Sequence, residues 1–458
     1  MKFVYPIEPV ICLNIATIAI RELLVNNLLM ETACKVNVGY NRTVCESIAS
    51  GLHRERNLTE ANSEIQRRIN DALGWCLSAN GVIPIVLLLF VGSFSDEHKS
   101  RKPFLILPTI GELIATLGCM LCVWFREVLP VEVIGTAHYV VPALFGTVPI
   151  LYMAAFAYVA DASGDKTCIV RLTVLQVSIN VCRTIGVVVG GYLFMRVGYG
   201  TLMQVCVLLL VAALCYGTFA VEDIKDESKS PPVRNICSYK HVWETLQLLT
   251  TSGGVRRTNI VFILGLQFLV VLVLIGEGNV LFWFTQQTYA WTNTDYAYFQ
   301  GIRSVLNSLA LSIAVPVTSK LFSLRDITIV VLSLFDKVIS NVICVTVKTS
   351  LGVYLATAVG TLTIAASSGI RSLSSTYVSK GDVGKAQSLL SIVEAVATGV
   401  ATWIYNRGVY YYTHNSYPYT FLHFSSSVCV LSACLCLWKS RNELSDQQDL
   451  CNKENSPP

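Results

Sequence analysis

The chain has 458 residues, of which 53% are hydrophobic and only 14% are charged, and its mean hydropathy is +0.56. A soluble domain of this length does not tolerate such a composition, so the bilayer is the expected solvent of most of the chain. The formal net charge of +4 is small and forms no basic stripe, which excludes nucleic acid as a partner.

Apolar runs long enough to cross a bilayer recur along the whole chain. A transmembrane helix needs about 20 apolar residues, because it rises about 1.5 Å per residue and satisfies its own backbone polar groups. The pattern therefore predicts an all-α membrane protein with roughly twelve transmembrane helices. The runs lie near 6–30, 74–95, 103–125, 133–158, 170–195, 199–220, 259–284, 299–319, 326–347, 351–372, 387–408 and 419–438.

The first break between these runs is the long polar stretch 31–72. It carries two N-glycosylation sequons, at Asn41 and Asn57, which are expected on the luminal or extracellular side. That side is oxidising, so Cys34 and Cys45 in the same stretch form a local disulfide or remain two free thiols. Most of the other cysteines lie within apolar runs and are interpreted as small packing residues, and none forms a spaced metal motif.

A charged motif follows the second apolar run. Gly92 is followed four residues later by Asp96, and then by the basic pair Arg101 and Lys102. The motif resembles the major facilitator signature between the second and third helices, although Ser100 stands where that family usually has a second glycine. The resemblance implies a latch that holds the helix bundles in one conformational state. An ordinary positively charged cytosolic turn is the alternative.

The second break, 221–258, is charged and divides the apolar runs into six and six. This layout predicts two helical bundles with a substrate site near the bilayer midplane. We expect an N-terminal bundle at 1–220, a cytosolic linker at 221–258, a C-terminal bundle at 259–440 and a cytosolic tail at 441–458.

The distribution of basic residues sets the orientation of the chain. With the amino terminus in the cytosol, the cytosolic short loops hold about nine Lys and Arg residues and the outer short loops about four. Both termini are therefore expected in the cytosol. The same orientation places both sequons outside, so the two signals agree.

Further segments resemble one solute-carrier branch of the major facilitator superfamily, which contains the proton-coupled folate transporter and its thymic and lysosomal relatives. The resemblance extends over nearly the whole chain and implies a carrier of folates, peptidoglycan fragments or conjugated organic anions. The segments that carry it are Glu8-Pro9, Gly92-Ser93, Ser95-Asp96, Ala157 to Asp161, Arg171 to Ile179, Gly190-Gly191 and Ser368 to Arg371.

The resemblance implies roles for single residues. Arg371 falls on the tenth-helix arginine that contributes to the substrate pathway and to proton coupling, and Asp161 falls on the aspartate that ends the fourth helix. The fifth-helix glutamate is replaced by Gln176, and the seventh-helix histidine by an apolar residue around Leu274. The family's disulfide from the first loop to the loop after the seventh helix has no partner cysteine in 285–297.

Ionisable residues inside apolar runs each cost about 2.5 to 3.5 kcal/mol on insertion, so each needs a partner, water or a function. Structural ion pairs are the alternative to a place along the pathway. Arginines outnumber the freely placed carboxylates, which points to an anionic substrate, because guanidinium groups bind carboxylates in a bidentate manner. The candidates for the substrate pathway are Arg371, Glu277, Arg21, Arg183 and Gln176.

Glu277 is the best-placed carboxylate for carrying a proton, because the amide of Gln176 cannot titrate. It is flanked by Gly276 and Gly278, which are expected to let the helix bend and expose it. Asp336 and Lys337 are adjacent in the ninth run and are expected to pair with each other.

These features predict a secondary active or facilitative transporter of a small organic anion, working by alternating access with or without protons. The chain is expected to act as a monomer in the lipid bilayer of the plasma or endolysosomal membrane, without a metal or another cofactor. No nucleophile motif or nucleotide-binding loop supports an enzyme or a nucleotide-driven pump. A membrane receptor or scaffold that keeps a carrier fold without turnover is the alternative.

Overall fold

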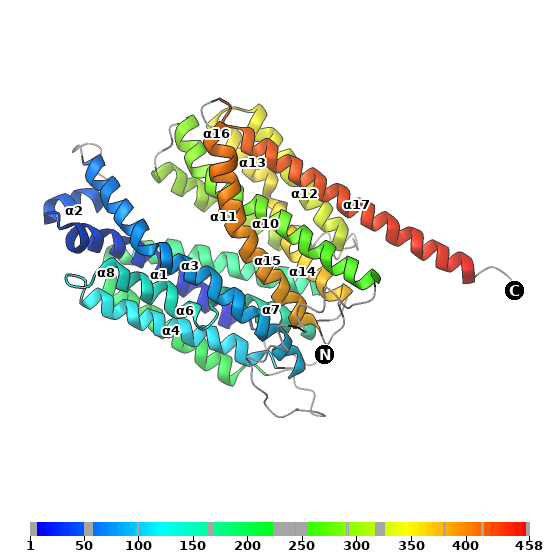
Figure 1. Ribbon diagram of the computed structural model, residues 1–458, viewed down its shortest axis with the longest axis horizontal. Coiled ribbons are helices and arrows are strands. Elements are labelled where there is room, and N and C mark those ends of the chain that lie inside the picture. Colours follow the sequence, from blue (N-terminus) through cyan, green and yellow to red (C-terminus); the bar gives the residue numbers. More distant parts are fainter. Residues whose placement is uncertain are drawn as a thin grey trace. The chain divides into compact units, whose positions relative to one another are not determined.

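All elements in the described part of the chain are helices, joined by turns (Figure 1). The structure is a computed structural model, and it describes residues 7–49, 58–98, 100–163, 168–222, 243, 254–289, 291, 293–316, 326–378, 382–413 and 416–454. The chain divides into two compact units, one formed by Met1–Tyr158 and Ser178–Thr245 and the other by Val159–Val177 and Leu246–Pro458.

Nine helical stretches within the described residues are long and apolar enough to cross a membrane. One of them, Val170–Phe219, has 50 residues and is broken at Gly198, where φ is +72°, so it has the length for two crossings. The helices α1 and α11, with 25 and 24 residues, also have the length of a crossing. These lengths accommodate the twelve crossings predicted from the sequence. The nine stretches are Asp71–Glu97, Lys102–Trp124, Val131–Ala162, Val170–Phe219, Arg257–Tyr289, Asp326–Thr346, Ser350–Tyr377, Val383–Tyr410 and Thr420–Arg441.

The first unit is built around α1, which packs against α3, α4 and α5. Its elements are α1 (Glu8–Thr32), the π-helical turn η1 (Ala33–Val38), α2 (Arg42–Ala49), α3 (Thr59–Glu97), α4 (Lys102–Trp124), α5 (Val131–Gly135), the π-helical turn η2 (Thr136–Val140), α6 (Val141–Ala143), and most of α7 (Thr147–Ala162) and α8 (Cys168–Phe219).

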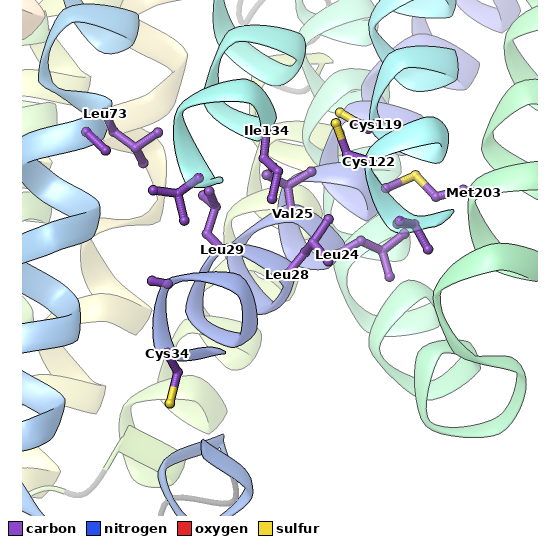
Figure 2. Packing of buried hydrophobic residues seen from close by; sticks show 14 of the residues in the cluster. Leu24, Val25, Leu28, Leu29, Cys34, Leu73, Cys119, Cys122, Ile134 and Met203 are labelled. Atoms are coloured by element: carbon purple, nitrogen blue, oxygen red, sulfur yellow. The ribbon is translucent and has the colours of Figure 1, made fainter. Parts of the chain in front are cut away.

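An apolar cluster holds these helices together (Figure 2). Leu24 and Leu28 of α1 are fully buried there, together with Cys119 and Cys122 of α4 and Met203 of α8. Cys119 and Cys122 therefore act as small packing residues, as their place in the apolar runs predicts.

The first polar stretch is more helical than the sequence analysis expects. It contains η1 and α2, and α3 already begins at Thr59, well before the apolar run near 74–95. The reason is that Ile65, Ala72 and Leu73 join the same apolar cluster, so packing supports a helix on the polar side of the run.

The helix is interrupted within the fourth predicted run, 133–158. The π-helical turn η2 is followed by a turn at 144–146, in which Gly146 and Thr147 have φ values of +86° and +38°. Residues with a side chain rarely adopt such backbone angles, so packing against the neighbouring helices holds this break. The break is not visible in the hydropathy of the sequence.

The second unit is centred on α10 and α12. Helix α10 packs against α14, α15 and α17, and α12 packs against α13, α14 and α17. The elements of this unit are α10 (Gly254–Tyr289), α11 (Asn293–Pro316), α12 (Asp326–Thr346), α13 (Ser350–Val359), the 3-10 turn η4 (Gly360–Ile364), α14 (Ala365–Tyr377), α15 (Val383–Trp403), the π-helical turn η5 (Ile404–Tyr410), α16 (Tyr411–Thr413) and α17 (Thr420–Glu454).

Candidate functional site

The first unit contains a cavity of about 230 Å³ with charged and aromatic walls. Helix α1 contributes Arg21 and Glu22, α4 contributes Glu112, η2 contributes His138, and α8 contributes Arg183. The other lining residues are Ile15, Ile18, Ala19, Asn80, Tyr139, Pro142, Thr147, Val148 and Tyr152.

Arg21 and Glu112 form a fully buried ion pair in this wall, with each side chain only 2% exposed. Nη1 of Arg21 also donates to the backbone oxygen of Glu112 and to Oγ1 of Thr116, both at 3.0 Å. The hydroxyl of Thr147 donates to Oε1 of Glu112 at 2.9 Å. Nε of Arg21 has no hydrogen-bond partner among the described residues.

A second pair in the same cavity is looser. Arg183 and Glu22 are 3.7 Å apart, with side chains 63% and 48% exposed. His138 is 6% exposed, and its Nδ1 has no partner in the described part of the chain. Two predicted pathway residues, Arg21 and Arg183, thus line one cavity, together with an imidazole that is available for a polar contact.

The second unit contains a smaller cavity of about 60 Å³. Its charged lining residues come from three helices: Glu277 from α10, Arg303 from α11 and Lys337 from α12. The remaining lining residues are Leu274, Leu281, Asn307, Ser340, Asn341, Cys344, Val353, Ala356, Thr357, Gly360, Thr363, Ile364 and Leu422.

Glu277 and Lys337 form an ion pair whose side chains are 8% and 13% exposed. Nδ2 of Asn341 donates to Oε1 of Glu277 at 2.9 Å and also lies 3.3 Å from the backbone oxygen of Leu422. Each oxygen of the Glu277 carboxylate therefore contacts a different side chain of α12. The expected pairing of Asp336 with Lys337 is wrong, because adjacent residues on a helix point in different directions. Asp336 instead accepts a hydrogen bond from the backbone N–H of Leu362 in η4, at 2.9 Å.

The glycines beside Glu277 do not bend α10, which runs as one helix through both of them. A Cβ atom at Gly276 would lie 2.2 Å from Cδ2 of Tyr405, whereas one at Gly278 would have nothing within 4 Å. Gly276 therefore serves the close approach of the buried Tyr405 ring, whose hydroxyl is 2.7 Å from Oγ of Ser425.

Arg371 lies in the same unit but lines neither of the two cavities. It is 1% exposed, and it donates to Oε2 of Glu394 at 2.6 Å and to Oε1 of Gln387 at 3.0 Å, which joins α14 to α15. Gln176 is half-buried on α8 and is also absent from both cavity walls. Their roles in the substrate pathway stay predictions.

The charged motif after the second crossing is tightly organised. Arg101 is 3% exposed and donates to Oδ1 of Asp96 at 2.5 Å and to Oγ of Ser95 at 2.7 Å. Lys102 donates to the backbone oxygen of Thr218 at 2.6 Å. The turn is thus closed by side chains and does not depend on a second glycine.

Gly92 and Asp161 complete the predicted latch. Gly92 is buried in α3 and Asp161 is exposed near the end of α7. Their roles in the latch stay predictions.

The segment between Cys34 and Cys45 is closed by a disulfide between these two residues, with Cα atoms 5.8 Å apart. The exposed Asn41 lies inside this loop, whereas Asn57 falls outside the described residues. The hydroxyl of Tyr40 donates to Glu64 at 2.5 Å, and this contact raises the pKa of Tyr40.

Comparisons with known proteins agree with this architecture. The sequence model of the Major Facilitator Superfamily matches residues 61–402. The chain is 25% identical to the lysosomal proton-coupled steroid conjugate and bile acid symporter SLC46A3 of Gallus gallus over 447 residues, which cover 95% of this chain and 92% of the relative. It is 27% identical to the proton-coupled folate transporter of Bos taurus, over 42% of this chain and 40% of the relative.

The fold has a solved counterpart in the crystal structure of the human organic anion transporter MFSD10. The TM-score is 0.68 at 14% identity, over 94% of this chain and 98% of that chain. The predicted fold class, an all-α membrane protein of the major facilitator type, is confirmed. The chain belongs to the Major Facilitator Superfamily, in the solute-carrier branch that contains the proton-coupled folate transporter.

Proposed function

We propose that this protein is a secondary transporter that carries a small organic anion across a membrane by alternating access. The family supports the transport of a solute, and the names of the two relatives support an anionic one, since they refer to steroid conjugates, bile acids and folate. A muropeptide is a further candidate because of the branch that the sequence resembles.

The observation that carries the proposal is the charge balance of the cavity in the second unit. Glu277 and Lys337 neutralise each other, whereas Arg303 has no ion-pair partner among the described residues. A guanidinium group in a site of low dielectric favours an anion over a neutral or cationic solute. The cavity therefore has the electrostatics of an anion site.

The first unit contributes a larger cavity, in which the positive and negative charges are balanced. Arg21 and Arg183 are offset there by Glu112 and Glu22, and Tyr139 and Tyr152 add aromatic rings. Such walls suit the ring system of a folate or a steroid, because aromatic side chains bury flat apolar surface and tolerate polar edges.

We further propose the orientation and the setting of the protein. Both termini lie in the cytosol, Asn41 and Asn57 are glycosylated on the opposite side, and the monomer is the functional unit. The motif of Asp96, Arg101 and Lys102, together with Gly92 and Asp161, controls the exchange between conformations and does not touch the solute. The protein is not an enzyme, and its membrane is the plasma membrane or an endolysosomal membrane.

Uptake by the purified protein in liposomes tests the proposal. Labelled folate, estrone sulfate, taurocholate and muramyl dipeptide are each presented at about pH 5.5 and about pH 7.5, with and without a proton gradient. We expect saturable accumulation of at least one of the four anions, inhibited by an excess of the unlabelled compound. If binding is measurable for one of them but no vesicle accumulates any, the receptor or scaffold alternative replaces the transporter.

A further inference from the structure

The cavity in the second unit is too small for a whole drug-sized solute. Its volume of about 60 Å³ is well below the roughly 300 to 1,000 Å³ of a pocket that encloses a drug-sized ligand. A carboxylate or sulfonate group has this size. Two cations, Arg303 and Lys337, line the space that such a group would occupy.

Lys337 is not free to bind an anion while Glu277 is ionised, since the two side chains form an ion pair. A second carboxylate on the same ammonium would bring two negative charges into one poorly solvated space, which is strongly unfavourable. A proton on Glu277 removes this conflict. The net charge of the three side chains then rises from one positive charge to two.

The other charged groups near Glu277 are held by other partners. Asp336 is next to Lys337 on α12, but it accepts a hydrogen bond from the backbone N–H of Leu362 and does not line the cavity. Helix α12 adds the thiol of Cys344, α17 the thiol of Cys429, and η5 the phenol of Tyr405, all of them neutral groups. On α14 and α15, which also pack against α10, Arg371 and Glu394 neutralise each other. The proton balance of the cavity therefore depends on Glu277.

We propose that this cavity receives the acid group of the transported anion on Arg303 and Lys337, and that Glu277 is an internal carboxylate that the solute must displace from Lys337. A proton from the aqueous phase binds to Glu277, the ion pair opens, and the acid group of the solute takes the place of the carboxylate. Lys337 keeps its own proton throughout. One proton therefore travels with each acid group, and the linkage is reciprocal, so the bound anion also favours the protonated form of Glu277. This inference rests on the proposed function, because it describes how the same solute is recognised and coupled.

The test uses the full-length protein in liposomes and the anion among folate, estrone sulfate and taurocholate that the wild type accumulates best. We expect the apparent affinity of the wild type to rise by up to about tenfold for each unit by which the pH falls. Glu277→Gln keeps the acceptor for Asn341 and imitates the protonated state. It should bind as tightly at about pH 7.5 as the wild type does at about pH 5.5, with a pH dependence of less than about twofold.

The two cations give separate expectations. Lys337→Gln should weaken binding at low pH by about tenfold or more, and Arg303→Gln should weaken it by a similar factor at every pH. The double variant Glu277→Gln with Lys337→Gln removes both charges of the ion pair and leaves Arg303 as in the wild type, so it should fold even if a single variant does not. It should bind weakly and without pH dependence.

Matched controls come from an ion pair outside the cavity. Lys385 and Asp382 are 3.0 Å apart at the start of α15, and the variants Lys385→Gln and Asp382→Asn should keep the pH profile of the wild type. Proton uptake on addition of the anion, measured in a weakly buffered solution, should be lost in Glu277→Gln. An unchanged pH profile and proton uptake in Glu277→Gln, or an unchanged affinity in Lys337→Gln, would overturn the inference while the transporter proposal stands. Absence of uptake by the wild type with every anion would overturn both.

Discussion

Replacing Arg21 by glutamine should make the stability of the protein depend on pH in a way that the wild type does not show. The substitution leaves Glu112 buried at 2% exposure, with the hydroxyl of Thr147 as its remaining side-chain donor. Breaking a buried ion pair from one side costs about 3 to 5 kcal/mol, because it leaves an uncompensated charge.

The carboxyl group of Glu112 can avoid this cost by taking up a proton. The free energy of protonation therefore sets how much stability the variant loses at each pH. Protonating an ordinary glutamate costs about 4 kcal/mol at pH 7 and about 1 kcal/mol at pH 5. Arg21→Gln should therefore lose about 4 kcal/mol of stability at pH 7 and recover about 3 kcal/mol of it at pH 5. The sign follows from linkage, since the folded variant binds a proton that the unfolded chain releases at neutral pH, so lower pH favours folding.

Glu112→Gln provides the matched comparison. It leaves Arg21 unpaired, and a guanidinium group cannot lose its proton in this range, so the loss of stability should be the same at both pH values. The double variant should be more stable than either single variant at pH 7. Thermal unfolding of the purified proteins in detergent, followed by fluorescence, measures these differences. Equal pH dependence in the two single variants would refute the reasoning.

Three other substitutions test separate parts of the structure. Asp96→Asn should slow turnover by about tenfold and change the apparent affinity for the solute by less than about twofold, because Asp96 pairs with Arg101 and lines neither of the two cavities. A larger loss of binding in a direct assay would count against the latch. Gly276→Ala should reduce the amount of folded protein, since the added Cβ would lie 2.2 Å from the Tyr405 ring. Adding Tyr405→Leu should restore part of the folded protein. A size-exclusion profile of Gly276→Ala that matches the wild type would contradict this packing. Asn41→Gln should increase electrophoretic mobility in the same direction as glycosidase treatment, and unchanged mobility would place this loop in the cytosol or leave the sequon unused.

Much of the fold follows from the sequence, because a bilayer imposes a simple rule on length and polarity. The apolar runs, the polar first loop and the charged middle segment are all visible in one dimension. The interruptions of the helices inside these runs are not visible in the sequence. The π-helical turn around His138 and the left-handed backbone at Gly146 arise from packing between helices, and both lie within a run that hydropathy shows as continuous.

The candidate site was predictable in its residue types but not in its pairing. Charged residues inside apolar runs are visible in the sequence, and both cavities are lined by such residues. Their partners come from other helices, however: Glu112 lies 91 residues after Arg21, and Asn341 lies 64 residues after Glu277. A single sequence carries no signal for such contacts, so adjacency alone pairs Lys337 with Asp336, whereas its partner is Glu277.

Three ion pairs between different apolar runs look alike in the sequence, and their surroundings separate them: Arg21–Glu112, Glu277–Lys337 and Arg371–Glu394. The pair of Arg371 with Glu394 joins two packed helices and lines neither cavity, so it is best suited to holding α14 against α15. The pair of Arg21 with Glu112 lines a cavity that is neutral overall, so an anion there gains mainly hydrogen bonds and ring contacts. Of the two cavities compared in the described part of the chain, the cavity of Glu277 and Lys337 is the one with an extra cation, Arg303. An anion can gain net Coulomb energy there, and a proton on Glu277 increases that gain, so recognition and coupling are expected at this same cavity.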